Sequence, residues 1–197
     1  MAARTLHLTG DKAADRLLGS DPLALLIGMV LDQQIPMERA FIAPYLLQER
    51  LGGPLDAASI AAMDPDDLAG VFSAKPALHR FPSSMAARVQ EVCRIIVEKY
   101  DSTASRVWTD ATDAKALLKN VKALPGFGEQ KAKIFIALLG KQLGLRVPGW
   151  AAVSAPFGAA DSFLSVADID SPASLAKVRQ HKQEMKAAAK ARAVTHP

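Results

Sequence analysis

Apolar residues recur along this chain at intervals of three and four, the spacing of one face of a helix. Asp21 and Pro22 are typical of a helix N-cap and first turn, so they predict a core helix behind them. Its inner face comprises Leu23, Leu26, Ile27, Val30 and Leu31. A second helix is predicted from Pro36 to the Leu-Gly-Gly at 51–53, with a kink at Pro44.

The remaining periodic segments are also helical. No stretch alternates with period two for long enough to predict a strand, and no internal repeat occurs, so we expect an all-α fold. The segment 72–84 has two prolines and no period, which indicates a loop. Further helices are predicted at 57–62, 65–70 with Asp64 as its cap, 84–100, 113–123 with Asp113 as its cap, from the turn at 124–128 to about 143, and from 171 to about 191.

Composition excludes several classes of protein. At 197 residues, half of them hydrophobic, the chain can form one substantial core or two small lobes. No window has the roughly 18 apolar residues of a membrane span, and the first residues do not resemble a secretory signal, so we expect a cytoplasmic protein with no membrane partner. The single cysteine, Cys93, falls at an apolar position of a predicted helix. One cysteine excludes an internal disulfide, a cysteine-ligated iron–sulfur cluster and a Cys-rich zinc site.

Charge is unevenly distributed along the chain. Residues 1–70 have 5 Lys and Arg against 10 Asp and Glu, whereas the rest have 19 against 10. A basic part beside an acidic part favours a surface that faces a polyanion, although basic surfaces also serve solubility.

The sequence LPGFG at 124–128 places two glycines in front of an apolar-periodic helix. Amides at a helix start lack partners within the helix and can bind a phosphate oxygen. We expect such donors near Gly126, Phe127, Gly128 and Glu129, with Lys131 and Lys133 adding phosphate contacts. The alternative is an ordinary corner between two helices.

Three motifs in one order resemble a known family. LPGFG followed by x-x-K-A and an apolar helix resembles the helix-hairpin-helix of the HhH-GPD superfamily of base-excision DNA glycosylases, which includes endonuclease III and the 3-methyladenine glycosylases. LIGMVLDQQIPMERAFIAPYLLQERLG at 26–52 resembles its early helix pair, and 65–100 resembles the segment between pair and hairpin.

The resemblance implies two lobes with duplex DNA containing a damaged base held between them. A six-helix barrel would comprise 21–140, with the hairpin at 113–140, and a second helical lobe would comprise 1–20 and 141–197. The resemblance also implies a monovalent cation, K⁺ or Na⁺, on the backbone carbonyls of Lys122, Leu124 and Phe127; this ion is optional, and no other cofactor is expected. On this basis we expect a nucleoid-associated monomer.

The catalytic positions of the family are not matched here. Its glycosylases have an Asp about 20 residues after the second hairpin glycine, where this chain has Pro148, Gly149 and Trp150. Bifunctional members have a Schiff-base lysine two residues after that glycine, where this chain has Gln130. Lys131 follows one place later, about 100° around the helix.

Two carboxylates are candidates to replace the missing Asp. Asp161 is the nearest one downstream, and its alternative role is a helix or turn cap. Asp32 lies in LDQQIP, a segment whose family counterpart lines the cleft. Hydrolysis of the N-glycosidic bond needs such a group to stabilise the sugar cation.

Other residues are candidates for contact with an everted base. Gln33 and Gln34 can hydrogen-bond base edges, or one of them can cap the helix before Pro36. Phe81 is a candidate wedge, with His79 and Arg80 holding the DNA backbone, or else a loop anchor.

Two further features have both a functional and a structural interpretation. Trp150 can stack on a base or pack in the core. The final helix can attract phosphate or act as a solubilising tail. Its cations are Lys177, Arg179, Lys182, Lys186, Lys190 and Arg192.

The sequence thus predicts a monofunctional DNA glycosylase, a hydrolase acting on N-glycosyl bonds in base-excision repair. The alternative is a catalytically silent relative that recognises damaged or bent duplex. A helical protein–protein adaptor is a third class.

Overall fold

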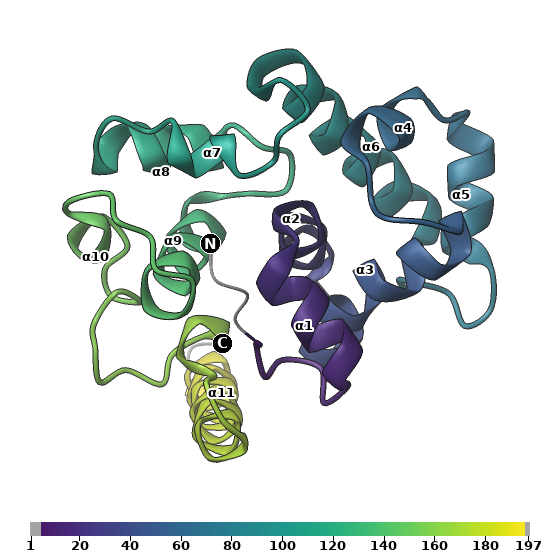
Figure 1. Cartoon of the computed structure of the whole chain (residues 1–197). Helices are drawn as coiled ribbons and strands as arrows, with labels where there is room; N and C mark the ends of the chain where they lie inside the picture. The colour runs from purple at the N-terminus through teal and green to yellow at the C-terminus, as the bar shows by residue number, and fades with distance from the viewer. Residues whose placement is uncertain (1–4, 196–197) are drawn as a thin grey trace.

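A computed structural model describes residues 5–195, and every regular element within this range is a helix (Figure 1). The all-α prediction is confirmed. The side chains of Lys182, Lys186, Lys190 and Arg192 lie outside the described part of the chain. The elements are α1 Lys12–Ser20, α2 Pro22–Leu31, α3 Met37–Leu51, α4 Ala57–Ala62, α5 Pro65–Ser73, α6 Pro82–Tyr100, α7 Arg106–Thr109, α8 Ala114–Lys122, α9 Glu129–Gln142, α10 Trp150–Val153, the 3₁₀ turn η1 Val166–Asp168, and α11 Pro172–Thr195.

Aspartates begin five of these helices. In each case the side chain precedes the helix and accepts hydrogen bonds from amides of the first turn, which otherwise lack partners. The predicted caps Asp21, Asp64 and Asp113 are confirmed. Asp11 and Asp56 cap α1 and α4 in the same way.

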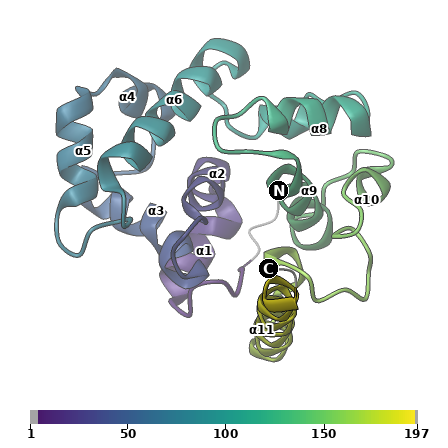
Figure 2. The ribbon, with the colours of Figure 1, turned by 180° about the vertical axis from the view of Figure 1, so that it is seen from behind.

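Helix α2 is buried on all sides rather than on one face. Every residue from Leu23 to Leu31 is buried, because α1, α3 and α6 pack around the helix. Figures 1 and 2, which show opposite sides, both place α2 in the middle of the molecule. The C-terminal end of α2 is therefore a point where distant segments can meet.

The elements on either side of α2 form one continuous apolar core. Helices α4 and α5 pack on α6, while α9 packs on α8, α10 and η1. Buried apolar side chains from Leu6 to Val178 belong to a single cluster. The predicted division into lobes at residue 140 stays a prediction.

Some predicted boundaries were wrong, and three helices were not predicted. α5 extends to Ser73 and α6 begins at Pro82, so the loop between them is 74–81 rather than 72–84. Proline is favoured in the first helical turn because its fixed φ suits a helix and its missing N–H is not needed there. α3 continues through Pro44. The missed elements are α1 and the four-residue helices α7 and α10; a segment as short as α7 or α10 cannot show a helical period.

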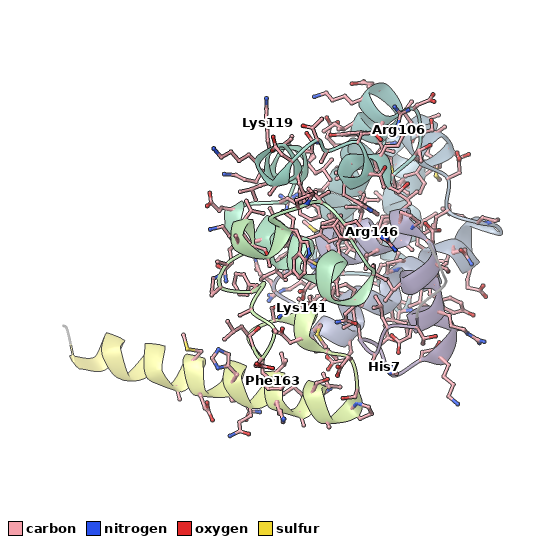
Figure 3. All side chains as sticks on the ribbon, turned by 60° about the vertical axis from the view of Figure 1, so that its left-hand side comes forward. His7, Arg106, Lys119, Lys141, Arg146 and Phe163 are labelled. Atoms are coloured by element: carbon pink, nitrogen blue, oxygen red, sulfur yellow. The ribbon has the colours of Figure 1, made fainter. Side chains whose placement is uncertain are left out.

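The last helix starts against the body and extends past it, as Figure 3 shows. Its first part is held by internal contacts: Lys177 Nζ lies 4.4 Å from the ring centroid of Phe163, and Arg179 pairs with Glu38 of α3. Two of the predicted phosphate-facing cations are therefore engaged within the chain. Among the described residues, no helix is both long enough and apolar enough to cross a bilayer.

Candidate nucleic-acid interface

The turn between α8 and α9 is anchored by its own apolar residues. Leu124 and Phe127 are buried, and the ring of Phe127 meets Phe135 edge to face at 5.6 Å. The Phe127 amide donates to the Leu124 carbonyl at 3.1 Å. The prediction that this amide is a free donor was therefore wrong, because the turn uses it. Gly126 has φ +86°, the left-handed region that favours glycine.

Helix α9 begins without a side-chain cap. Its N-cap is the exposed Gly128, and the first backbone bond into the helix is from the Ala132 amide to the Gly128 carbonyl at 2.9 Å. The amides of 129–131 precede that bond and form the positive end of the helix dipole. This uncapped N-terminus differs from the five helix N-termini that an aspartate side chain caps.

Glu129 sits at this helix start between two lysines. Lys122 Nζ lies 2.8 Å from Glu129 Oε2, and Lys133 Nζ lies 3.2 Å from Glu129 Oε1. The two ammonium groups lower the pKa of Glu129, Lys122 having the larger effect. Exposed pairs of this kind contribute only about 0–1 kcal/mol, so an incoming phosphate can compete for the lysines.

Lys131 is directed into the protein instead of toward solvent. Its Nζ donates to the Met29 carbonyl at 2.7 Å and lies 3.4 Å from that of Val30, both at the end of α2. Burial lowers the pKa of Lys131, Asp32 opposes that shift and Arg88 adds to it. This orientation differs from the outward one that a phosphate contact requires, because the third residue of α9 faces α2.

Gln33 is the glutamine that caps α2. Its Nε2 donates to the Val30 carbonyl at 2.8 Å and approaches Met85 Sδ at 3.2 Å, while its Oε1 accepts from Arg88 Nη1 at 3.0 Å. Both ends of the amide are thus used inside the protein. Gln34 is exposed and has φ 56°. Of the two candidates for base contact, only Gln34 presents its side chain outward.

The 79–81 loop is hydrogen-bonded to Gln33 through His79. His79 is buried, its Nε2 lies 2.9 Å from the Gln33 carbonyl, and its Nδ1 lies 3.1 Å from the Phe81 amide. The expectation that His79 holds DNA is therefore wrong, since both ring nitrogens are used internally. Phe81 is 42% exposed, and the Arg80 guanidinium lies 4.8 Å from its ring centroid.

Arg88 joins the hairpin turn to this cluster, although no sequence motif identified it as a site residue. A Cβ built on Gly126 would lie 3.1 Å from Arg88 Cδ, so the arginine stem packs against the turn while its guanidinium holds Gln33. Nothing in the pattern of α6 separates Arg88 from the exposed Arg94. The turn, the 32–36 loop and the 79–81 loop are consequently linked in one cluster.

The two candidate carboxylates lie in different grooves. Asp32 lines a largely apolar groove of about 470 Å³ together with Gln130, Phe157 and His181. Asp161 is exposed and lines another, of about 680 Å³, with Trp150. The structure therefore places Asp32 beside the linked cluster and Asp161 apart from it.

The segment 148–150, where the family has its Asp, forms the start of α10. Gly149 has φ +80° and precedes Trp150, the first residue of that helix. A Cβ on Gly140 would lie 2.3 Å from Trp150 Cε3, so the half-buried indole packs directly on α9. This contact favours the packing role of Trp150 over base stacking.

A buried ion pair fixes the region beside α10. Lys141 pairs with Asp168 and donates to Ser162 Oγ at 2.9 Å, and Asp168 Oδ2 accepts from the Leu164 and Ser165 amides. Figure 3 shows Lys141 and Phe163 in this part of the molecule. All charges of this set are satisfied internally, which indicates a structural role.

The predicted cation on the carbonyls of Lys122, Leu124 and Phe127 stays a prediction. The Leu124 carbonyl already accepts the Phe127 amide, which leaves one lone pair for an ion. Among the described side chains, no cluster of three His, Cys, Asp or Glu residues could hold a metal ion.

Comparison with models of protein families, with curated proteins and with solved structures gave no match to this chain.

Proposed function

We propose that this chain is a DNA-repair protein of the helix-hairpin-helix glycosylase type that binds damaged duplex and hydrolyses an N-glycosidic bond. The observation that supports the proposal most is the linkage of three segments that the family resemblance assigns to DNA contact. Arg88 joins the hairpin turn at Gly126 to Gln33, and His79 joins Gln33 to the 79–81 loop. The three segments are far apart in sequence and adjacent in the fold.

The DNA backbone would bind at the start of α9. The amides of residues 129–131 supply donors, and Lys122 and Lys133 supply positive charge once phosphate replaces Glu129 as their partner. Phe81, exposed on the 79–81 loop that His79 joins to Gln33, would fill the gap that an everted nucleotide leaves.

The chemistry would depend on Asp32. It lines a largely apolar groove of about 470 Å³, and its charge and that of Lys131 attract each other. A carboxylate in that position can stabilise positive charge on the sugar. The Lys131 amine donates to the Met29 carbonyl, so we expect no Schiff base and no strand cleavage. Activity should be weak on ordinary lesions and greatest on cationic alkylated bases, which leave readily.

A second candidate is a catalytically silent protein that recognises damaged or bent duplex. The specific observation in its favour is the segment 148–150, which contains no carboxylate and packs against α9. Under this hypothesis Asp32 would only attract Lys131 and help hold α2 to α9.

Incubation with a panel of lesion duplexes, followed by alkali, distinguishes the two candidates. We expect abasic product on an alkylated duplex, with D32N at least about 100-fold slower, the loss typical of a removed electrostatic stabiliser. D161N is the matched control and should retain activity, because Asp161 lies in a different groove. Selective binding without product supports the silent relative, and absence of both product and binding contradicts the whole proposal.

A further inference from the structure

The hydrogen bonds of His79 define its protonation state. A backbone amide can only donate, so the Phe81 N–H requires a lone pair on Nδ1. The ring proton must then be on Nε2, which donates to the Gln33 carbonyl at 2.9 Å. Because the side chain is only 1% exposed, water cannot easily replace either partner. The folded structure therefore selects the neutral Nε2–H tautomer.

The surroundings of His79 also oppose its protonation. Burial is the main cause that lowers its pKa from the usual 6.5, and the cations Arg39 of α3 and Arg80 of its own loop lower it further. The carbonyls of Gln33 and Leu31, which face the ring from the end of α2, act in the opposite direction. From α6, Arg88 binds the side chain of Gln33.

One hydrogen bond to this ring helps to orient an exposed aromatic side chain. Phe81 and Met185 are the exposed large hydrophobic residues in the described part of the chain. The Phe81 ring centroid lies 6.0 Å from that of His79, and Arg80 covers the ring. Phe81 also precedes Pro82, so its backbone sets the start of α6.

We propose that neutral His79 is the positioning residue that holds Phe81 ready to insert into distorted duplex, and that protonation of His79 releases it. A proton taken from solvent by Nδ1 would place an N–H against the Phe81 N–H. Two donors cannot share a hydrogen bond, so the contact would be replaced by repulsion. Preference for damaged over intact duplex would consequently fall at acidic pH. This inference rests on the proposed DNA-binding function for its consequence and on the hydrogen bonds alone for its mechanism.

The mechanism can be tested without DNA by NMR titration of the whole chain between pH 4.5 and 8. We expect the Nε2–H tautomer at neutral pH, and a change in the shift and exchange rate of the Phe81 amide with the midpoint of the His79 ring, below 6.5. H7Q, which removes an exposed histidine, should keep this response, whereas H79Q should lose it. The Nδ1–H tautomer, or a Phe81 amide whose chemical shift and exchange rate do not change as His79 titrates, would overturn the proposal.

The consequence is tested by fluorescence anisotropy with an intact duplex and one that contains a tetrahydrofuran abasic analogue. We expect the preference for the abasic duplex to fall about tenfold below the His79 midpoint, the effect of one lost hydrogen bond. H79Q, which has no titratable ring, should have a preference that does not vary with pH. F81A changes an exposed residue, so it should fold and show the low preference at every pH.

The two hypotheses fail in distinguishable ways. If the wild type binds neither duplex, the proposed function is wrong, while the NMR titration still decides the role of His79. If both duplexes bind but H79Q keeps the wild-type pH profile, the inference about His79 is wrong and the proposed function stands.

Discussion

Gly128 offers a direct test of phosphate binding at the start of α9. It has φ −68° and ψ 172°, torsions that any residue adopts, and a Cβ there would meet no atom within 4 Å. G128L therefore adds a side chain in front of the first amides without strain. Gly126 differs, because its φ is +86° and a Cβ would press on Arg88. Of the two hairpin glycines, only Gly128 can therefore be replaced without strain.

The effects of G128L on stability and on DNA binding should separate. Replacing glycine at a compatible φ stabilises by about 0.4–1 kcal/mol through the unfolded state. Loss of a favourable N-cap residue costs about 0.5–1 kcal/mol, so the free energy of unfolding should change by less than about 0.5 kcal/mol. Blocking one bond between an amide and a charged phosphate removes about 1.5–3 kcal/mol, which is roughly 10- to 100-fold in Kd.

Fluorescence anisotropy with damaged and intact duplexes at two salt concentrations gives the answer. We expect the same loss for every duplex and an unchanged salt slope, because no cationic side chain is removed. G70L is the matched control, since Gly70 is exposed on α5 and a Cβ there also meets open space. Wild-type affinity in folded G128L would refute phosphate binding by these amides.

Substitutions at three further positions test packing, burial and helix capping. K131M should lower the free energy of unfolding by about 1–3 kcal/mol, because the charged donor to the Met29 carbonyl is lost, and calorimetry should show a Tm lower by several degrees. Burial lowers the pKa of Lys131, so the stability of the wild type should rise with pH toward 10.5, whereas K131M should lack that rise. G140A should cost about 1–3 kcal/mol and change the near-UV circular dichroism, because its Cβ would overlap the Trp150 ring; an unchanged spectrum would contradict this contact. Burial raises the pKa of Asp21, so the stability of the wild type should fall as pH rises above 3.8. In urea unfolding at pH 7, the free energy of unfolding of D21N should match or exceed that of the wild type, whereas D21A should lose about 1 kcal/mol because the helix cap is removed.

Much of the secondary structure could be predicted from the sequence because it depends on neighbours in the chain. An aspartate caps a helix through amides two or three residues away, so Asp21, Asp64 and Asp113 were identified from their local context. The position of Cys93 on the inner face of α6 also followed from helical period, and it is buried with its pKa raised to about 12.

The candidate site could be predicted only in part, because its key contacts join distant segments. Gln33 and Gln34 are alike in sequence, and only the packing of Arg88 and Met85 against Gln33 shows which one caps α2. Asp32 and Asp161 were both candidates from the sequence, and only the fold shows that they lie in separate grooves.

Lys131 shows the physical reason most clearly. Its place after the hairpin glycines suggests an outward cation, and helical period alone cannot say what lies opposite that face of α9. The Met29 carbonyl it binds is 102 residues away in the chain and becomes available only because α2 ends in the middle of the fold. Local sequence determined the helices, their caps and the hairpin turn, whereas the meeting of α2, α6 and α9 decided which polar side chains are consumed inside the protein and which remain for a ligand.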